Sequence, residues 1–272
     1  MKKVLLICLP LFICMSLGAQ NDNGNAQWVA KPIKIDGNDK EWKKPFGNID
    51  AQSKIQYSIL NDDKNLYLCF EISEQLYQVK AMRAGMRLNF TAKGKNKLDA
   101  SVNFPLEQLS DLTPPAAPGE PKQRPDPKQV RDRFLISNTT MNTSGFATRN
   151  GMLSVKDTSG LNAYINFDST DVMVYELVIP LKELLGKGYA AADLSKELTM
   201  EMTVNAIERP QHNVGSDMNG ADNGAGMRRG GGGYGGGHRG GGGYRGGGSG
   251  MNRSVLFEKS SFKHKFSLAS KS

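Results

Sequence analysis

The feature that most constrains this chain is a series of short runs in which apolar and polar residues alternate. In residues 55–59 and again in 66–72 every second residue is apolar, and a polar Asn-Asp-Asp-Lys sequence at 61–64 separates the two runs. An apolar residue at every second position is the pattern of a β-strand with one buried face. The two runs therefore predict a β-hairpin, in which Tyr67, Cys69 and Glu71 lie on the face away from the core.

Similar runs continue along the chain, and long helical periodicity is absent. The further strand-like runs are residues 86–90, 102–105, 134–141, 151–155, 161–167, 172–179, 198–207, 254–257 and 262–268. Residues 74–83 fit either a helical turn or a loop, and residues 181–185 fit a single helical turn. Many short strands between turns predict an all-β fold, an antiparallel β-sandwich with short helical turns.

Residues 1–19 have the organisation of a secretory signal peptide. Lys2 and Lys3 form a short basic segment, residues 4–17 form an almost entirely apolar run, and small residues follow at Gly18 and Ala19. The apolar run is short for a membrane span, and an anchor that is never cleaved is the alternative. We expect an exported protein, periplasmic, on the cell surface or secreted, without a membrane span after cleavage.

The cysteines fit the same interpretation. Cys14 follows Phe12 and Ile13, whose side chains are too bulky for a lipid-attachment site, so a lipid anchor at Cys14 is not expected. Once the signal peptide is removed, Cys69 is the remaining cysteine and cannot form an internal disulfide. Its position in a strand-like run predicts a buried, unreactive thiol.

The mature chain divides into a polar stretch at residues 20–27 and one β-sandwich domain at residues 28–268. Residues 113–127 are rich in proline, which lacks the amide hydrogen that a central strand needs, so they predict an exposed loop. Residues 215–252 are rich in glycine and arginine, cannot form a packed core, and predict a long disordered loop. Because strand-like runs follow this segment, we expect an insertion within the sheet and not a tail.

The glycine-rich segment contains the residue types of an RNA-binding tract. Arg228 and Arg239 could attract phosphate groups, and Tyr234 and Tyr244 could stack on bases. The formal net charge of +8 is concentrated in this segment and in the signal peptide, so the rest of the chain is nearly neutral. Since an exported protein does not meet RNA, we expect no nucleic-acid partner. The alternatives are that the glycine-rich segment contacts an anionic glycan or a cell-envelope protein, or that it is a solvated insertion without a partner.

Three stretches together resemble the carbohydrate-binding family 9-like modules, which are related to the DOMON-like β-sandwiches. They are Ile35-Asp36-Gly37 with Trp42, the hairpin at residues 57–72 with its Asp62-Asp63 turn, and Tyr175-Glu176-Leu177-Val178-Ile179-Pro180-Leu181. The three occur in the family's order and would place the match at about residues 28–268. The resemblance implies a ligand-binding sandwich.

Sugar-binding members of this family use exposed aromatic rings, because the C–H face of a sugar packs on a flat π surface. Trp42 lies in the first stretch and is expected to anchor the core. The motifs do not assign a binding site, and the remaining candidates are aromatic or arginine side chains: Trp28, Tyr77, Tyr189, Tyr234, Tyr244, Arg228 and Arg239.

Two pairs of aspartates could hold calcium through hard oxygen ligands. The pairs are Asp62 with Asp63, and Asp168 with Asp171. Side chains that bond the local backbone in a turn are the favoured alternative for both pairs. No other cofactor is expected, since the three histidines lack the spacing of metal ligands.

The sequence contains no recognisable catalytic constellation, so we do not expect an enzyme. The leading hypothesis is an exported binding module for carbohydrate. The alternatives are a structural or interaction protein of the cell envelope that uses the glycine-rich loop, and a haem-binding or electron-transfer sandwich of the DOMON-like kind. The last would need an axial methionine or histidine pair.

Overall fold

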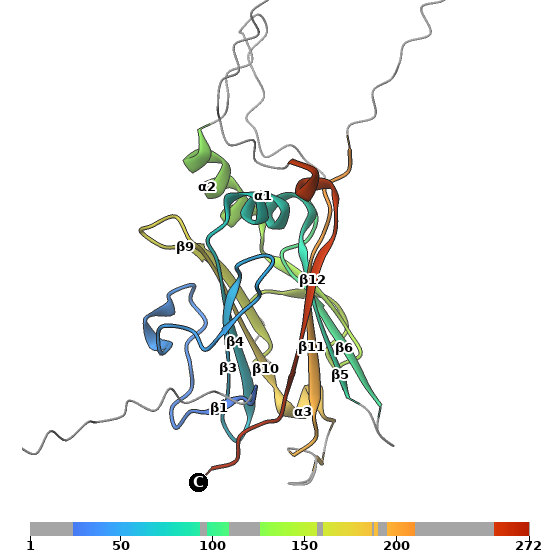
Figure 1. Cartoon of the computed structure of the whole chain (residues 1–272). Coiled ribbons are helices and arrows are strands. Elements are labelled where there is room, and N and C mark those ends of the chain that lie inside the picture. Colours follow the sequence, from blue (N-terminus) through green and yellow to red (C-terminus); the bar gives the residue numbers. More distant parts are fainter. Residues whose placement is uncertain are drawn as a thin grey trace, which may run out of the picture.

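The computed structural model describes residues 24–92, 97–108, 126–156, 160–186, 188–189, 195–209 and 253–271. These residues form two six-stranded sheets that face each other, and helices cover one end (Figure 1). Every strand pair is antiparallel except β1 with β3. The predicted antiparallel β-sandwich is confirmed.

The first sheet has the order β1-β3-β4-β10-β9, and β2 also pairs with β3. Its strands are β1 (Gln27–Trp28), β2 (Asn48–Ile49), β3 (Gln56–Asn61), β4 (Asn65–Ile72), β9 (Asn162–Phe167) and β10 (Met173–Pro180). The second sheet has the order β12-β11-β5-β6-β7-β8. Its strands are β5 (Met86–Ala92), β6 (Leu98–Asn103), β7 (Thr140–Ser144), β8 (Gly151–Ser154), β11 (Leu198–Val204) and β12 (Ser260–Phe266).

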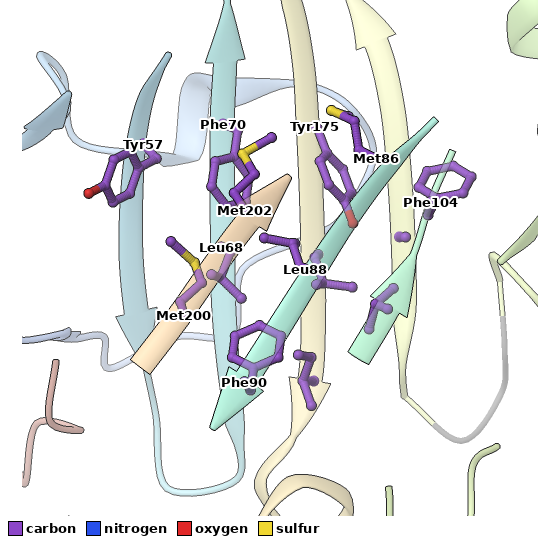
Figure 2. Close-up of a cluster of buried hydrophobic side chains, with 14 of the residues drawn as sticks. Tyr57, Leu68, Phe70, Met86, Leu88, Phe90, Phe104, Tyr175, Met200 and Met202 are labelled. Atoms are coloured by element: carbon purple, nitrogen blue, oxygen red, sulfur yellow. The ribbon is translucent and has the colours of Figure 1, made fainter. Parts of the chain in front are cut away.

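The main core lies between the two sheets (Figure 2). The rings of Tyr57, Phe70 and Tyr175 stack along the first sheet, with centroids 5.9 Å and 5.7 Å apart. The second sheet faces them with fully buried side chains, at Leu88, Phe90, Met200 and Met202. The alternating runs thus bury their apolar positions as predicted, and the hairpin forms with Asn61 opposite Leu66.

The outer face of β4 is also buried, which the alternation did not predict. Tyr67 is 1% exposed and Cys69 is fully buried, in a second apolar cluster with Trp42 and Phe46. Figure 1 shows the N-terminal segment on the side of β3 and β4 away from the second sheet. This cover removes the expected solvent-facing side of the hairpin. It also confirms Cys69 as a buried thiol, whose pKa is raised by burial.

Two strand predictions are wrong. Phe134 lies in helix α2 (Pro127–Ser137), which begins at a proline after the N-cap Asp126, and the strand starts later, at Thr140. The segment at 254–257 belongs to the 3₁₀-helix η2 (Arg253–Phe257). Each of these segments contains only a few apolar residues, and so short a run does not distinguish helical from strand periodicity.

The other short helices are η1 (Asp39–Glu41), α1 (Gln75–Ala84) and α3 (Leu181–Leu184). Of these, α1 and α3 lie where the sequence allowed helical turns, and η1 lies where no helix was predicted. Among the described residues, no helix has the length and apolar character needed to cross a membrane.

The chain re-enters the second sheet after the glycine-rich segment. Strand β12 pairs with β11 over its whole length, from Leu198 opposite Phe266 to Val204 opposite Ser260. Beyond these strands, the amide of Ile207 donates to the carbonyl oxygen of Leu256 at 2.8 Å. The two ends of the connection between β11 and β12 therefore lie next to each other, beside the ends of these two strands. Residues 215–252, like 1–19 and 113–125, lie outside the described residues.

Part of the polar stretch that the sequence placed before the domain is joined to β12. The amide of Ala26 donates to the carbonyl oxygen of Ser267 at 3.0 Å, and the Nε2 atom of His264 lies 2.9 Å from the carbonyl oxygen of Gly24. The folded unit therefore includes residues before Trp28.

Candidate functional site

The two ends of the sandwich differ (Figure 1). The hairpin end carries the β3–β4 turn and α3, which are joined where the amide of Leu181 donates to the carbonyl oxygen of Lys64 at 2.7 Å. The helix end carries α1, α2 and η2, and the connection between β11 and β12 starts and finishes there. We refer to the two ends by these names below.

A cleft of about 300 Å³ opens at the hairpin end. We call it the hairpin-end cleft; its lining includes Lys97, Asp99, Phe146, Glu183, Leu184 and Lys196. The residues come from the start of β6, the segment after β7, α3 and the segment before β11. Its volume falls in the range of small-molecule sites, roughly 300–1,000 Å³.

The wall formed by residues 145–148 is fixed against its neighbours. Gly145 has a φ of +76°, and a Cβ atom there would lie 1.9 Å from the carbonyl oxygen of Asp99, so only glycine permits this approach to β6. The carboxylate of Glu183 accepts hydrogen bonds from the amide and hydroxyl of Thr148, each at 2.8 Å, and the Ala147 amide donates to the Glu183 carbonyl oxygen. The cleft is therefore largely preformed on this side.

The cleft combines an apolar floor with charged groups. Phe146 and Leu184 are 4% and 3% exposed and supply the floor. Lys97 and Asp99 lie on the β6 side, and neither forms a side-chain hydrogen bond or ion pair with another described residue. A cation and a carboxylate side by side in a cleft supply donors and acceptors for a ligand with several hydroxyl groups.

The predicted aromatic candidates separate between the two ends. Trp28 pairs with Asn61 and is half-buried at the hairpin end. Tyr189 lies at the same end, where its hydroxyl donates to the carbonyl oxygen of Asp63 at 3.0 Å, and burial raises its pKa. Tyr77 is a residue of α1 at the helix end; it is 6% exposed and its side chain packs in the core, so its ring offers no platform to solvent. The candidates Tyr234, Tyr244, Arg228 and Arg239 lie outside the described residues.

The Asp62–Asp63 pair holds its own turn. The Oδ1 atom of Asp62 accepts from the amides of Lys64 and Asn65, both at 2.7 Å, and its Oδ2 atom accepts from the Tyr67 hydroxyl at 2.7 Å. The Asp63 side chain is exposed beside this turn. Asp62 therefore bonds the local backbone and stabilises the turn, as the alternative to calcium binding predicted.

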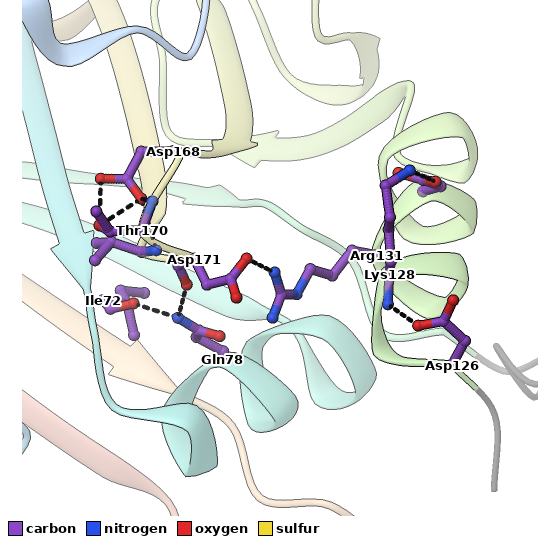
Figure 3. Close-up of polar contacts among 10 residues, drawn as sticks. Ile72, Gln78, Asp126, Lys128, Arg131, Asp168, Thr170 and Asp171 are labelled. Atoms are coloured by element: carbon purple, nitrogen blue, oxygen red, sulfur yellow. Dashed lines mark hydrogen bonds and ion pairs between the residues drawn. The ribbon is translucent and has the colours of Figure 1, made fainter.

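The second pair connects a turn to two helices (Figure 3). Asp168 accepts from the amides of Thr170 and Val172, at 2.8 Å and 2.9 Å. Asp171 forms an ion pair with Arg131 of α2, and its carbonyl oxygen accepts from the Gln78 side chain of α1 at 2.8 Å. Across the described residues, no group of three or more metal-ligating side chains gathers at either pair.

Two of the three stretches that carry the family resemblance meet at a buried carboxylate. Glu176 is fully buried and accepts hydrogen bonds from the amides of Asp36 and Gly37, at 2.9 Å and 2.6 Å, and from Nε1 of Trp42 at 2.7 Å. Burial raises the pKa of Glu176, and these donors oppose the rise. The expected role of Trp42 as a core anchor is confirmed, and these residues hold the N-terminal segment on the sheet.

The sequence did not single out Lys97, Asp99 or Glu183. Lys97 and Asp99 lie at the start of one strand, Glu183 lies far along the chain in a short helix, and the three match no motif. The one local indication is Gly145, where a glycine between a strand and a turn permits a close backbone approach.

No protein-family model matches the chain, and no curated protein matches it. Matching solved structures include a carbohydrate-binding module of family 9 from Caldicellulosiruptor kristjanssonii in complex with cellotriose. It is 12% identical, with a TM-score of 0.30, over 66% of this chain and 75% of that chain. The same module in complex with glucose gives 13% identity and a TM-score of 0.29, over 66% and 76%. The assignment of this chain to the β-sandwich class depends on its own strand pairing.

Proposed function

We propose that this protein is an exported, non-catalytic carbohydrate-binding module that binds a sugar in the hairpin-end cleft. The observation that carries the proposal is the position of Lys97 and Asp99, which have no side-chain partner among the described residues, beside the apolar floor of the cleft. Sugars present hydroxyl groups around a ring whose faces carry C–H groups, so they need hydrogen-bonding partners and an apolar contact in one site. The signal-peptide pattern at residues 1–19 and the family-like stretches support the same function.

The test is binding of the purified mature protein to a glycan array, followed by titration calorimetry with the best ligands. Asp99→Asn keeps the shape of the side chain and removes its charge, and Lys97→Ala removes the cation. Because hydrogen bonds to charged groups contribute about 1.5–3 kcal/mol, each change should weaken binding by about tenfold or more. The control is Lys182→Ala, an exposed residue on α3 at the same end that does not line the cleft. Equal affinity in all variants, or no retained glycan across the array, would contradict the proposal.

The second candidate is a cell-envelope interaction protein that uses the glycine-rich segment. It is favoured by the position of that connection, which starts and finishes at the helix end, away from the hairpin-end cleft. Removing residues 215–252 separates the two functions. Unchanged sugar affinity is expected if the cleft is the ligand site, and loss of an envelope partner alone would support the second candidate.

A further inference from the structure

A lysine and a serine from distant parts of the chain meet at the helix end. Lys80 of α1 is fully buried, and its ammonium group donates to the hydroxyl of Ser260 at 2.7 Å. Ser260 begins β12 and is partly exposed. A serine hydroxyl is a weak nucleophile until an adjacent base takes its proton, and a lysine amine can be that base. The contact therefore has the arrangement of an activated serine.

The surroundings of Lys80 favour its neutral form. Lys80 forms no ion pair with another described residue, and its ammonium group lies 5.0 Å from the centroid of the Tyr77 ring. Burial lowers its pKa to about 8, and the charge of Glu258 opposes this change. Near that pH a large share of Lys80 is the neutral amine, which can accept the hydroxyl proton of Ser260. A buried lysine in contact with a nucleophile is a candidate for a functional site.

A small cleft opens beside Ser260. Its volume is about 10 Å³, the space of one water molecule, and its lining includes Ser260, Gln52, Tyr77 and Phe262. A space of this size accommodates a single oxygen atom, such as that of a carbonyl group. Gln52 is exposed, and its amide group carries N–H donors that can stabilise negative charge on such an oxygen. The cleft therefore admits a small acyl group next to Ser260, and the rest of an acyl donor remains in solvent.

We propose that Ser260 is a nucleophile that accepts a small acyl group from an ester, with Lys80 as its base. The neutral amine of Lys80 takes the hydroxyl proton while Oγ of Ser260 forms a bond to the carbonyl carbon of the ester. The bond between that carbon and the alcohol oxygen then breaks, and the Lys80 ammonium group returns the proton to the leaving alcohol. The products are an acyl ester of Ser260 and a free alcohol. This site lies at the helix end and does not depend on the proposed sugar binding.

The test is incubation of the mature protein with 4-nitrophenyl acetate, followed by peptide mapping with mass spectrometry. We expect an acetyl group on Ser260 that hydroxylamine removes, because hydroxylamine cleaves a serine ester and leaves a lysine amide intact. Ser260→Ala should abolish this acetylation. Ser261→Ala is the matched control, since Ser261 is the next residue of β12, is exposed and has no side-chain hydrogen bond to another described residue. It should leave the rate of Ser260 acetylation unchanged.

The pH dependence of the acetylation rate tests the role of Lys80. In the unmodified protein the rate should rise with pH and level off above about pH 8, where Lys80 is neutral. Lys80→Met should slow the reaction at pH 8 by about 100-fold or more, the usual effect of losing a positioned base. Should this variant not fold, the pH profile of the unmodified protein decides. No acetyl group on Ser260, an unchanged rate in folded Lys80→Met, or a rate without a plateau near pH 8 would overturn the proposal.

Discussion

Glu176 shows how one side chain can fix a long segment of chain. Its carboxylate satisfies three donors from residues 36–42, and its bonds to the Gly37 amide and the Trp42 ring are buried. Both carboxylate oxygens of Glu176 accept hydrogen bonds. Replacement of Glu176 by glutamine puts an NH₂ group in place of one of these oxygens, so at least one N–H donor loses its acceptor.

We therefore predict that Glu176→Gln lowers the free energy of unfolding by about 1–3 kcal/mol, the cost of an unsatisfied buried group. Urea denaturation followed by tryptophan fluorescence measures the change. The control is Glu197→Gln, which removes only a solvent-exposed ion pair with Lys265, and should change stability by less than about 1 kcal/mol. Equal stability of the two variants would show that Glu176 is not the anchor of the N-terminal segment.

Lys80 gives a prediction for the pH dependence of stability. This α1 residue is fully buried, its ammonium group donates to the Ser260 hydroxyl at 2.7 Å, and it lies 5.0 Å from the centroid of the Tyr77 ring. Burial lowers the pKa of Lys80 to about 8, although the charge of Glu258 opposes this change.

Between pH 8 and the ordinary lysine pKa of 10.5, the unfolded chain keeps the Lys80 proton and the folded protein releases it. Stability therefore rises with pH across this window, by at most about 1.4 kcal/mol per pH unit. We predict that the rise is lost in Lys80→Met, when denaturation midpoints of both proteins are compared at pH 7, 8, 9 and 10. Parallel curves for the two proteins would contradict a lowered pKa at this position.

At the scale of elements, α2 is held to the sandwich by apolar packing of Val130, Phe134 and Leu135 and by polar contacts. Phe134 is its one fully buried residue, and Arg131 pairs with Asp171 and lies 5.0 Å from the ring centroid of Phe167 (Figure 3). The Arg131 side chain therefore joins this helix to both the Asp168–Asp171 turn and strand β9.

We predict that Arg131→Ala speeds hydrogen exchange of the amides at residues 127–137, because the helix opens more often when this contact is lost. Hydrogen-exchange mass spectrometry of that segment gives the rates. Lys128→Ala is the matched control, since Lys128 lies on the same helix and pairs only with exposed Asp132. Equal exchange in the two variants would show that apolar packing, and not the Arg131 contact, holds the helix.

The elements also show where local pattern was sufficient. Leu66, Leu68 and Phe70 alternate with their neighbours, and the hairpin formed as expected because each strand buries this face in the core. Residues 134–141 contain both the end of a helix and the start of a strand, and too few apolar residues to indicate which period applies.

At the scale of the whole molecule, the connection between β11 and β12 is expected to be dispensable for folding. The two strands pair along their length, and the Ile207–Leu256 hydrogen bond joins the chain on either side of residues 210–252. Closing a shorter loop costs less entropy, by about 0.6 kcal/mol for each halving of its length.

We predict that replacing residues 210–252 with a four-residue Gly/Ser linker keeps the melting temperature equal or raises it. A chain ending at residue 209 is the contrasting variant, because it lacks β12 and exposes the edge of β11, so it should not melt cooperatively. Far-UV circular dichroism during heating measures both. A linker variant that is unfolded would mean that the replaced segment is part of the fold.

The sequence by itself determined most of the strands, the hairpin and the return of the chain to the sheet after the glycine-rich segment, because each of these follows from local periodicity and turn chemistry. The tertiary structure alone decided that residues 29–46 cover the outer face of β4, that Glu176 receives the amides of Asp36 and Gly37, and that Lys97 and Asp99 share a cleft with α3. These features join residues distant along the chain. Their contacts depend on how the two sheets pack, and a one-dimensional pattern contains no information about that packing.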